Sequence, residues 1–221
     1  MLRRYWMAAP VQMKIALLSD LHGRDIPGLA ENIARETPDV ICLAGDMLEY
    51  RKDHDNSAGL AFLKCLPQIA PTLYVTGNHE IDMPGRVHRE LRRAGLRWVN
   101  DTCLQVGGVW FAGLPATGSR GIVESLARRQ GYRVLLCHHP EYYDGLIKPY
   151  DIPLTLSGHT HGGQWRLGGR GVYAPGQGVW PRYDGGLFEN RLIVSRGLAN
   201  TTWIPRFGNP REWALIRLGD M

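Results

Sequence analysis

Five short apolar runs, each followed at once by polar side chains, constrain the fold of this chain most. The runs cover residues 14–19, 39–44, 72–76, 133–137 and 154–157. Continuous apolar runs of this length, without alternation of polar and apolar residues, are typical of strands that are covered on both faces. The sequence therefore predicts a sheet whose strands are buried in the interior of the protein.

Amphipathic segments with a helical period separate these runs. They cover residues 28–36, 57–66, 84–94 and 122–129. Pro84 suits the first turn of a helix, and Gly95, just past the end of the same segment, suits a helix stop. The alternation of strands and helices predicts an α/β protein with parallel strands and helices on both faces of the sheet.

The rest of the chain adds shorter signals and no linker. The stretch Val106-Gly107-Gly108-Val109 predicts a two-residue hairpin, so part of the sheet is expected to be antiparallel. Further strands are expected at residues 192–195 and 213–218. We find no internal repeat, so residues 1–221 are expected to form a single domain, with residues 1–12 as a short N-terminal extension.

Composition excludes several classes of protein. With 221 residues, 44% of them hydrophobic and 21% charged, the chain can bury a large core and is not disordered. The net charge of +5 permits an anionic partner without identifying one. Pairs of arginines at residues 92–93 and 128–129 lie in expected helices, where solvated faces explain them, so we expect no stable nucleic-acid partner.

The cysteines and the absence of long apolar stretches bear on location. Cys42, Cys65, Cys103 and Cys137 are far apart and contain no Cys-x-x-Cys pair, so we expect buried reduced thiols. No apolar stretch approaches the roughly 20 residues that cross a bilayer, and the first residues contain no signal-peptide core. We expect a cytoplasmic protein; peripheral contact with a membrane and the oligomeric state are left open.

The polar residues that follow the strands predict a metal centre, because ligands bind beyond the carboxyl ends of strands in open α/β sheets. Nitrogen and oxygen ligands without thiolate suit Mn²⁺, Fe, Zn²⁺ or Co²⁺. A set of seven is too large for one ion and about right for two ions that share a carboxylate. The candidate ligands are Asp20, His22, Asp46, Asn78, His138, His159 and His161.

Each of these residues has a plainer explanation when it is taken alone. Asp20 and Asp46 could be turn formers or helix caps, and His22 or His138 could be satisfied polar side chains. However, five of the eight histidines fall into clusters at strand ends, an order for which turn chemistry gives no reason. Two divalent ions with two carboxylates would leave a charge of roughly +2, which suits hydrolysis of an anionic ester.

Five blocks of the sequence resemble, in order and spacing, the signature of the calcineurin-like metallophosphoesterase superfamily. Residues 158–164 and 173–198 look like the small bacterial phosphoesterases of the YkuE/YaeI type. The resemblance covers nearly the whole chain and implies a four-layer α/β/β/α sandwich with mixed sheets. The blocks are Asp20-x-His22, Gly45-Asp46, Gly77-Asn78-His79-Glu80, His138 and Gly158-His159-Thr160-His161.

The resemblance also implies how the ligands are shared. One ion would be held by Asp20, His22, Asp46 and His161, and the other by Asp46, Asn78, His138 and His159. The ions would be two divalent transition metals, Mn²⁺ first, with Fe, Zn or Co as alternatives. We choose His138 over His139 because it directly follows the strand and has the family's His-x-Pro spacing to Pro140.

The activity that the resemblance implies is hydrolysis of an anionic phosphoester substrate, expected to be a phosphodiester. A hydroxide that bridges the two metals would attack phosphorus, and His79 would be the catalytic residue that assists the leaving group. The carboxylate that pairs with His79 is either Glu49 or Glu80, and the sequence leaves this open.

Two alternatives remain. One is a hydrolase of a lipid-linked pyrophosphate such as UDP-diacylglucosamine, and the other is a scaffold that kept the fold without the chemistry. The first would need a groove for an apolar tail. Core packing is the plainer explanation of the aromatic residues that could line such a groove, which are Trp180, Tyr183, Trp203 and Phe207.

Overall fold

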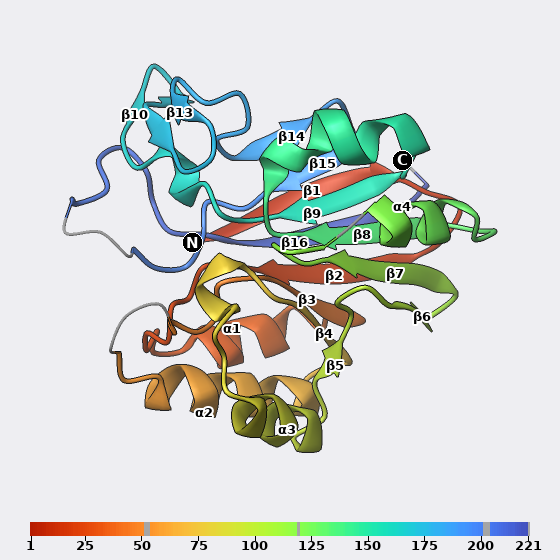
Figure 1. Cartoon of the computed structure of the whole chain (residues 1–221), viewed down its shortest axis with the longest axis horizontal. Helices are drawn as coiled ribbons and strands as arrows, with labels where there is room; N and C mark the ends of the chain where they lie inside the picture. The colour runs from red at the N-terminus through yellow and green to blue at the C-terminus, as the bar shows by residue number, and fades with distance from the viewer. Residues whose placement is uncertain (51–53, 119, 201–203, 221) are drawn as a thin grey trace.

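The computed structural model describes residues 1–50, 54–118, 120–200 and 204–220. Within these residues the chain forms two six-stranded sheets that pack face to face, with helices on the outer face of each (Figure 1). Strands of both orientations occur in each sheet. The predicted α/β/β/α sandwich with mixed sheets is therefore confirmed.

The first sheet has the strand order β1-β16-β2-β3-β4-β5. Strand β16 runs antiparallel to β2 and parallel to β1, and the other neighbours are parallel. The strands are β1 (Leu2–Ala8), β2 (Met13–Leu18), β3 (Val40–Ala44), β4 (Thr72–Val75), β5 (Arg97–Trp98) and β16 (Trp213–Gly219).

The interpretation of residues 1–12 as an extension is wrong for most of that segment. Strand β1 pairs with β16 in parallel along its whole length, from Leu2 opposite Trp213 to Ala8 opposite Gly219. Met7 is buried in the core between the two sheets. The N-terminal segment is therefore an edge strand of the first sheet.

The second sheet has the strand order β14-β15-β9-β8-β7-β6. Its four inner strands are parallel and its edge strands β6 and β14 are antiparallel to their neighbours. Positive φ angles at Gly107 and Gly108 form the predicted two-residue hairpin. The strands are β6 (Cys103–Val106), β7 (Val109–Leu114), β8 (Arg133–Cys137), β9 (Leu154–Ser157), β14 (Gly186–Phe188) and β15 (Leu192–Val194).

Helices cover the outer faces of both sheets. The apolar sides of α1 (Leu29–Arg35), α2 (Ser57–Cys65) and α3 (Gly85–Arg93) pack on the first sheet, and α4 (Arg120–Ala127) packs on the second. The π-helix Tyr143–Ile147 joins α4 there. The remaining elements are short: 3-10 helices at Leu66–Gln68, Asn78–Glu80, Pro140–Tyr142, Lys148–Tyr150 and His161–Gly163, and strands β10 (Arg166–Leu167), β11 (Arg170–Gly171), β12 (Tyr173–Ala174) and β13 (Gly178–Val179).

The cysteines are free thiols. Cys42 and Cys137 are fully buried, whereas Cys65 and Cys103 are half-buried. Burial raises the pKa of the Cys42 and Cys137 thiols well above the usual range, so both are inert at neutral pH. Separately, no helix in the described part of the chain is long and apolar enough to cross a bilayer.

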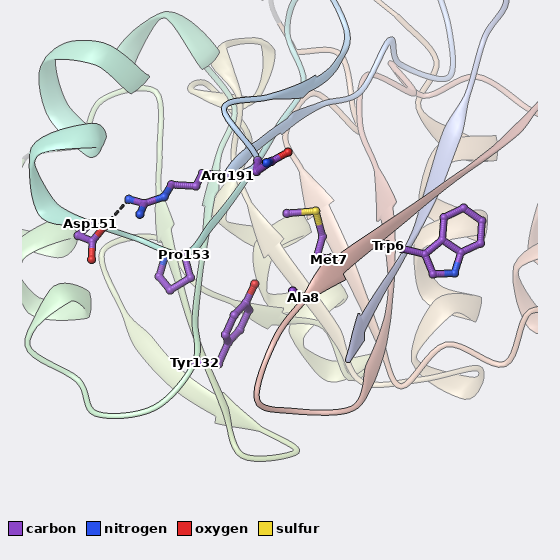
Figure 2. A pocket seen from close by; sticks show the side chains of 8 residues that line it. Trp6, Met7, Ala8, Tyr132, Asp151, Pro153 and Arg191 are labelled. Carbon is purple, nitrogen blue, oxygen red and sulfur yellow. Dashed lines mark hydrogen bonds and ion pairs between the residues drawn. The ribbon is translucent and has the colours of Figure 1, made fainter. Parts of the chain in front are cut away.

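A cavity of about 370 Å³ lies where β8, β9 and β15 begin (Figure 2). Tyr132, Pro153 and Arg191 directly precede these three strands, and Arg191 pairs with Asp151 in the same cavity. The residues that follow the strands lie at the opposite ends. This cavity is therefore remote from the predicted ligands.

The buried carboxylate of Glu80 bridges the loops that follow β3 and β4 in the first sheet. Glu80 accepts hydrogen bonds from the amides of Asp46, Leu48 and Gly77, at 3.1, 2.9 and 2.8 Å, and also from the Tyr74 hydroxyl. Its side chain is 2% exposed. Glu80 therefore fixes the loop after β3 against the loop after β4.

We expect Glu80→Ala to lower the free energy of unfolding of the metal-free protein by about 2–4 kcal/mol, because three buried amides would lose their acceptor. Urea denaturation in the presence of a chelator measures this. The control is Glu90→Ala on α3, where an exposed ion pair with Lys64 contributes about 0–1 kcal/mol. Equal stability of the Glu80 variant and the wild type would contradict this role.

Candidate metal centre

The seven predicted ligands all lie in loops that leave the carboxyl ends of parallel strands. These loops follow β2, β3 and β4 in the first sheet and β8 and β9 in the second. Because the sheets are stacked with these ends at one edge, the side chains meet. In chain order the ligands are Asp20 and His22 after β2, Asp46 after β3, Asn78 after β4, His138 after β8, and His159 and His161 after β9.

The backbone is strained where it delivers these side chains. Five of the seven residues, all in the described part of the chain, have left-handed φ angles, which cost about 1–3 kcal/mol each outside glycine. Hydrogen bonds from the Asp20 amide to the Gly45 carbonyl and from the His22 amide to the Asp46 carbonyl, both 3.0 Å, hold two of them. The angles are 55° at Asp20, 50° at His22, 53° at Asp46, 72° at His159 and 49° at His161.

Two glycines allow the loops to approach this closely. A Cβ at Gly77 would lie 2.2 Å from Oδ1 of Asp46, and a Cβ at Gly45 would lie 2.5 Å from Nδ1 of His138. Both distances are far below van der Waals contact. The glycines that the sequence places before Asp46 and Asn78 are therefore required by packing inside the site.

Asp20, His22 and His161 form one group of potential ligands, with ligand atoms within 4.8 Å of one another. Nε2 of His161 lies 3.6 Å from Oδ1 of Asp20, and the His161 and His22 rings are stacked with centroids 5.2 Å apart. Both ring nitrogens of His22 are buried and have no hydrogen-bond partner among the described residues. Orphaned buried nitrogens of this kind fit a residue that ligates an ion.

Asp46, His138 and His159 form a second group. Nε2 of His138 lies 3.0 Å from Oδ2 of Asp46 and 3.2 Å from Nδ1 of His159. The side-chain oxygen of Asn78 is buried and has no hydrogen-bond partner in the described part of the chain. Asp46 also lies within ligand distance of His22. A carboxylate in this position can bridge two ions.

In the metal-free site, Asp46 and His138 shift each other's pKa in opposite directions. Burial acts to raise the pKa of Asp46, but the attraction of His138, His22 and His79 outweighs it and holds that pKa well below its usual range. Burial lowers the pKa of His138, but Asp46 outweighs this and raises it to about 10. Without an ion, His138 is therefore protonated and donates a hydrogen bond from Nε2 to the ionised carboxylate of Asp46.

The two histidines after β9 behave differently from His138. Burial, with the nearby charge of His138, lowers the pKa of His159 well below its usual range. Burial also lowers the pKa of His161, to about 4, although Asp20 opposes the shift. Both imidazoles are neutral at pH 7, which is the form that can ligate a metal.

His79 pairs with Glu49 and not with Glu80. Nδ1 of His79 lies 2.5 Å from Oε2 of Glu49, whereas Glu80 is occupied by the backbone amides and Tyr74. Nε2 of His79 lies 3.9 Å from Oδ2 of Asp46, so this nitrogen points toward the ligand cluster. Burial lowers the pKa of His79, and the carboxylates of Asp46 and Glu49 oppose that shift.

A cavity of about 460 Å³ opens onto the cluster. His79 lines it on one side, and His139 and Glu141 line it on another. His139 was passed over as a ligand in favour of His138, and Glu141 was not singled out from the sequence. The only sequence signal for Glu141 is its position three residues after His138.

Arg206 is a further side chain at the site that the sequence did not single out. Its guanidinium lies 3.2 Å from Nδ1 of His161 and donates a hydrogen bond to the carbonyl of Ala199. Burial lowers the pKa of Arg206 to about 10, so it remains a cation at neutral pH. It adds positive charge beside the first group of ligands.

Of the four aromatic residues considered for an apolar groove, the three that the structure describes differ in exposure. Tyr183 is buried in the core beneath the second sheet, as the packing explanation predicted. Trp180 and Phe207 are exposed, and Trp203 lies outside the described residues. Among the three described residues, Trp180 and Phe207 are therefore the two that meet solvent.

Comparison with known proteins shows relatives of this chain. An uncharacterized metallophosphoesterase of Helicobacter pylori (strain J99) is 27% identical over 169 residues, which are 69% of this chain and 45% of that protein. The chain thus spans less than half of that relative's length. Phosphodiesterase YaeI of Escherichia coli (strain K12) is 28% identical over 221 residues, which cover 87% of this chain and 77% of YaeI.

Structural comparison and a family model agree with these relatives. The crystal structure of TT1561 of Thermus thermophilus has a similar fold, with a TM-score of 0.52 and 20% identity over 68% of this chain and 83% of that one. The family model described as "Calcineurin-like phosphoesterase" matches residues 13–163, the segment that contains all seven predicted ligands. The chain therefore belongs to the calcineurin-like phosphoesterase family of metal-dependent phosphoesterases, as the five sequence blocks predicted.

Proposed function

We propose that this chain is a phosphodiesterase with a dinuclear metal centre. The observation that carries this proposal is that two groups of buried potential ligand atoms, one around Asp20 and one around His138, adjoin, because His22 of the first and Asp46 of the second also lie within 4.8 Å of each other. The proposed ligands of one ion are Asp20, His22, Asp46 and His161, and those of the other are Asp46, Asn78, His138 and His159.

The side chains present fit this assignment. Nitrogen and oxygen donors suit Mn²⁺, which we propose first, and also Fe, Zn²⁺ and Co²⁺. The orphaned nitrogens of His22 and the orphaned oxygen of Asn78 are buried donors that an ion would satisfy. When bound, the two ions supply the positive charge and Lewis acidity that hydrolysis of a phosphoester requires.

His79 is the proposed catalytic residue. With Nδ1–H donated to Glu49, the ring presents Nε2 toward the ligand cluster and the cavity. Nε2 is then placed to give a proton or a hydrogen bond to the oxygen that leaves phosphorus. Glu49 fixes the ring orientation and favours the protonated form.

The phosphodiesterase YaeI and the free thiols support two finer proposals. Phosphodiesterase activity is named for YaeI, so we propose a diester before a monoester as the substrate. The four free cysteines support a reducing compartment, for which we propose the cytoplasm.

A matrix of metals and substrates tests the proposed function. Metal-free protein is reconstituted with Mn²⁺, Zn²⁺, Fe²⁺ or Co²⁺ and assayed on an aryl diester, an aryl monoester, cyclic nucleotides and UDP-diacylglucosamine. We expect two equivalents of metal and turnover of the aryl diester. Less than one equivalent with no turnover would favour the scaffold alternative, and selective turnover of UDP-diacylglucosamine would favour the lipid-linked one.

We expect His79→Ala to lower kcat on the aryl diester by about 100-fold or more while two equivalents of metal are retained, because general acid catalysis is lost. Steady-state kinetics and elemental analysis measure both quantities. His88→Ala is a matched control, since His88 lies on α3 and stacks on Trp98 away from the cavity. Near wild-type kcat in His79→Ala would refute the role of His79.

The raised pKa of His138 predicts a pH-dependent metal affinity. At pH 7 this residue carries a proton in the metal-free protein, and an ion must displace that proton to bind. Binding of Mn²⁺ at pH 7 should therefore release about one proton from His138, and affinity should rise roughly tenfold per pH unit between pH 6 and 8. Titrations in a weakly buffered indicator solution count the protons, and an affinity independent of pH would contradict the prediction.

A further inference from the structure

Glu141 lies next to the second group of candidate ligands, beside His159. It belongs to the short helix Pro140–Tyr142 that follows β8, and it lines the same cavity. Its Oε1 lies 3.7 Å from Nε2 of His159. The other ring nitrogen, Nδ1, faces His138 at 3.2 Å. The carboxylate of Glu141 thus lies beside Nε2 of His159, whereas the other ring nitrogen faces His138.

His139 and Gly176 lie close to the carboxylate of Glu141. Nδ1 of His139 lies 2.9 Å from Oε1, so the His139 ring can donate a hydrogen bond to it. Gly176 has a φ of +72°, and a Cβ there would lie 2.2 Å from Oε1, so the absence of a side chain leaves room for the carboxylate. The buried Oε2 accepts no hydrogen bond from the described residues, so acceptor capacity remains.

The pattern repeats the arrangement of Glu49. Oε2 of Glu49 lies 2.5 Å from Nδ1 of His79 and 3.7 Å from Nδ1 of His22. Each carboxylate therefore bonds one histidine that lines the cavity and lies 3.7 Å from one proposed ligand histidine. Glu49 and Glu141 are thus arranged alike on the two sides of the site, which favours a similar role for both carboxylates.

The other proposed ligand histidines of the second sheet also have an oxygen on their outward nitrogen. Nδ1 of His138 lies 2.7 Å from the carbonyl of Ala44, and Nδ1 of His161 lies 3.2 Å from the carbonyl of Ala199. For His159 the oxygen on this side is a carboxylate. A carboxylate behind a ligating imidazole orients the ring, selects its tautomer and raises its basicity.

We propose that Glu141 is a positioning residue for the second metal site, acting through His159. The carboxylate accepts the Nε2–H of His159, after a movement of a few tenths of an ångström from 3.7 Å into hydrogen-bond distance. The tautomer with the proton on Nε2 leaves the lone pair of Nδ1 directed at the ion. This inference rests on the proposed ligand set, in which His159 holds the second ion.

The test is a titration of metal-free protein with Mn²⁺, followed by calorimetry or by competition with a fluorescent chelator. Wild-type protein must bind two equivalents; if it does not, the proposed function fails and not this inference alone. Glu141→Gln keeps the shape of the side chain and removes the charge. We expect it to weaken one binding step by about 10- to 100-fold and to leave the other step unchanged.

Two variants, each of which lacks a proposed ligand of one ion, identify the affected step. In Asn78→Ala protein only the first ion is expected to bind tightly, and adding Glu141→Gln should not change that remaining affinity. In His22→Ala protein, where the second ion remains, adding Glu141→Gln should weaken binding as in the wild type. Glu31→Gln, on the exposed side of α1, is the matched control and should change neither step.

Gly176→Ala provides a second route that keeps the carboxylate and displaces it. It should weaken the same step as Glu141→Gln, and thermal unfolding in a chelator checks that each variant is folded. The inference is overturned if neither variant changes a binding step or if both steps weaken equally. It is also overturned if wild type binds a third equivalent that Glu141→Gln loses, since Glu141 would then be a ligand.

Discussion

The contact between His138 and the loop after β3 is the interaction on which the site depends, because it joins the two sheets. His138 follows β8 of the second sheet, yet its Nδ1 lies 2.7 Å from the carbonyl of Ala44, the last residue of β3, and its Nε2 lies 3.0 Å from Asp46 in the loop after β3. Gly45 allows this approach, since a Cβ there would lie 2.5 Å from Nδ1. Because the sheets are stacked, this contact fixes the distance between the candidate ligand atoms of His138 and Asp46, which follow strands of different sheets.

Most of the fold could be predicted because its inner strands are continuous apolar runs. Strand β1 could not, since it lies at the sheet edge with only Met7 buried and with Trp6 58% exposed, so it carries no such run. Its partner β16 is more than 200 residues away along the chain, and no local signal reports that pairing. Strand β5, with two residues, is too short for any periodicity to indicate it.

At the site, the sequence predicted the residues that converge but not the contacts among them. Glu49 and Glu80 were equivalent candidates for His79, and only the fold decides between them, because Glu80 is occupied by the amides of the loops after β3 and β4. The left-handed backbone at Asp20 and His159 could not be predicted either, because the sequence does not give φ angles. Glu141 was missed because its contact with His159 depends on how β8 and β9 pack side by side.

The metal-free site is an unfavourable local structure that the rest of the protein must hold. Left-handed residues such as Asp46 cost about 1–3 kcal/mol each, and buried polar atoms without partners, as in His22 and Asn78, add about 1–3 kcal/mol apiece. The apolar core between the sheets and the hydrogen bonds to Glu80 offset these costs. Ions that satisfy the orphaned atoms would relieve part of this cost without moving the backbone, so the rigidity of the site would preorganise it for binding.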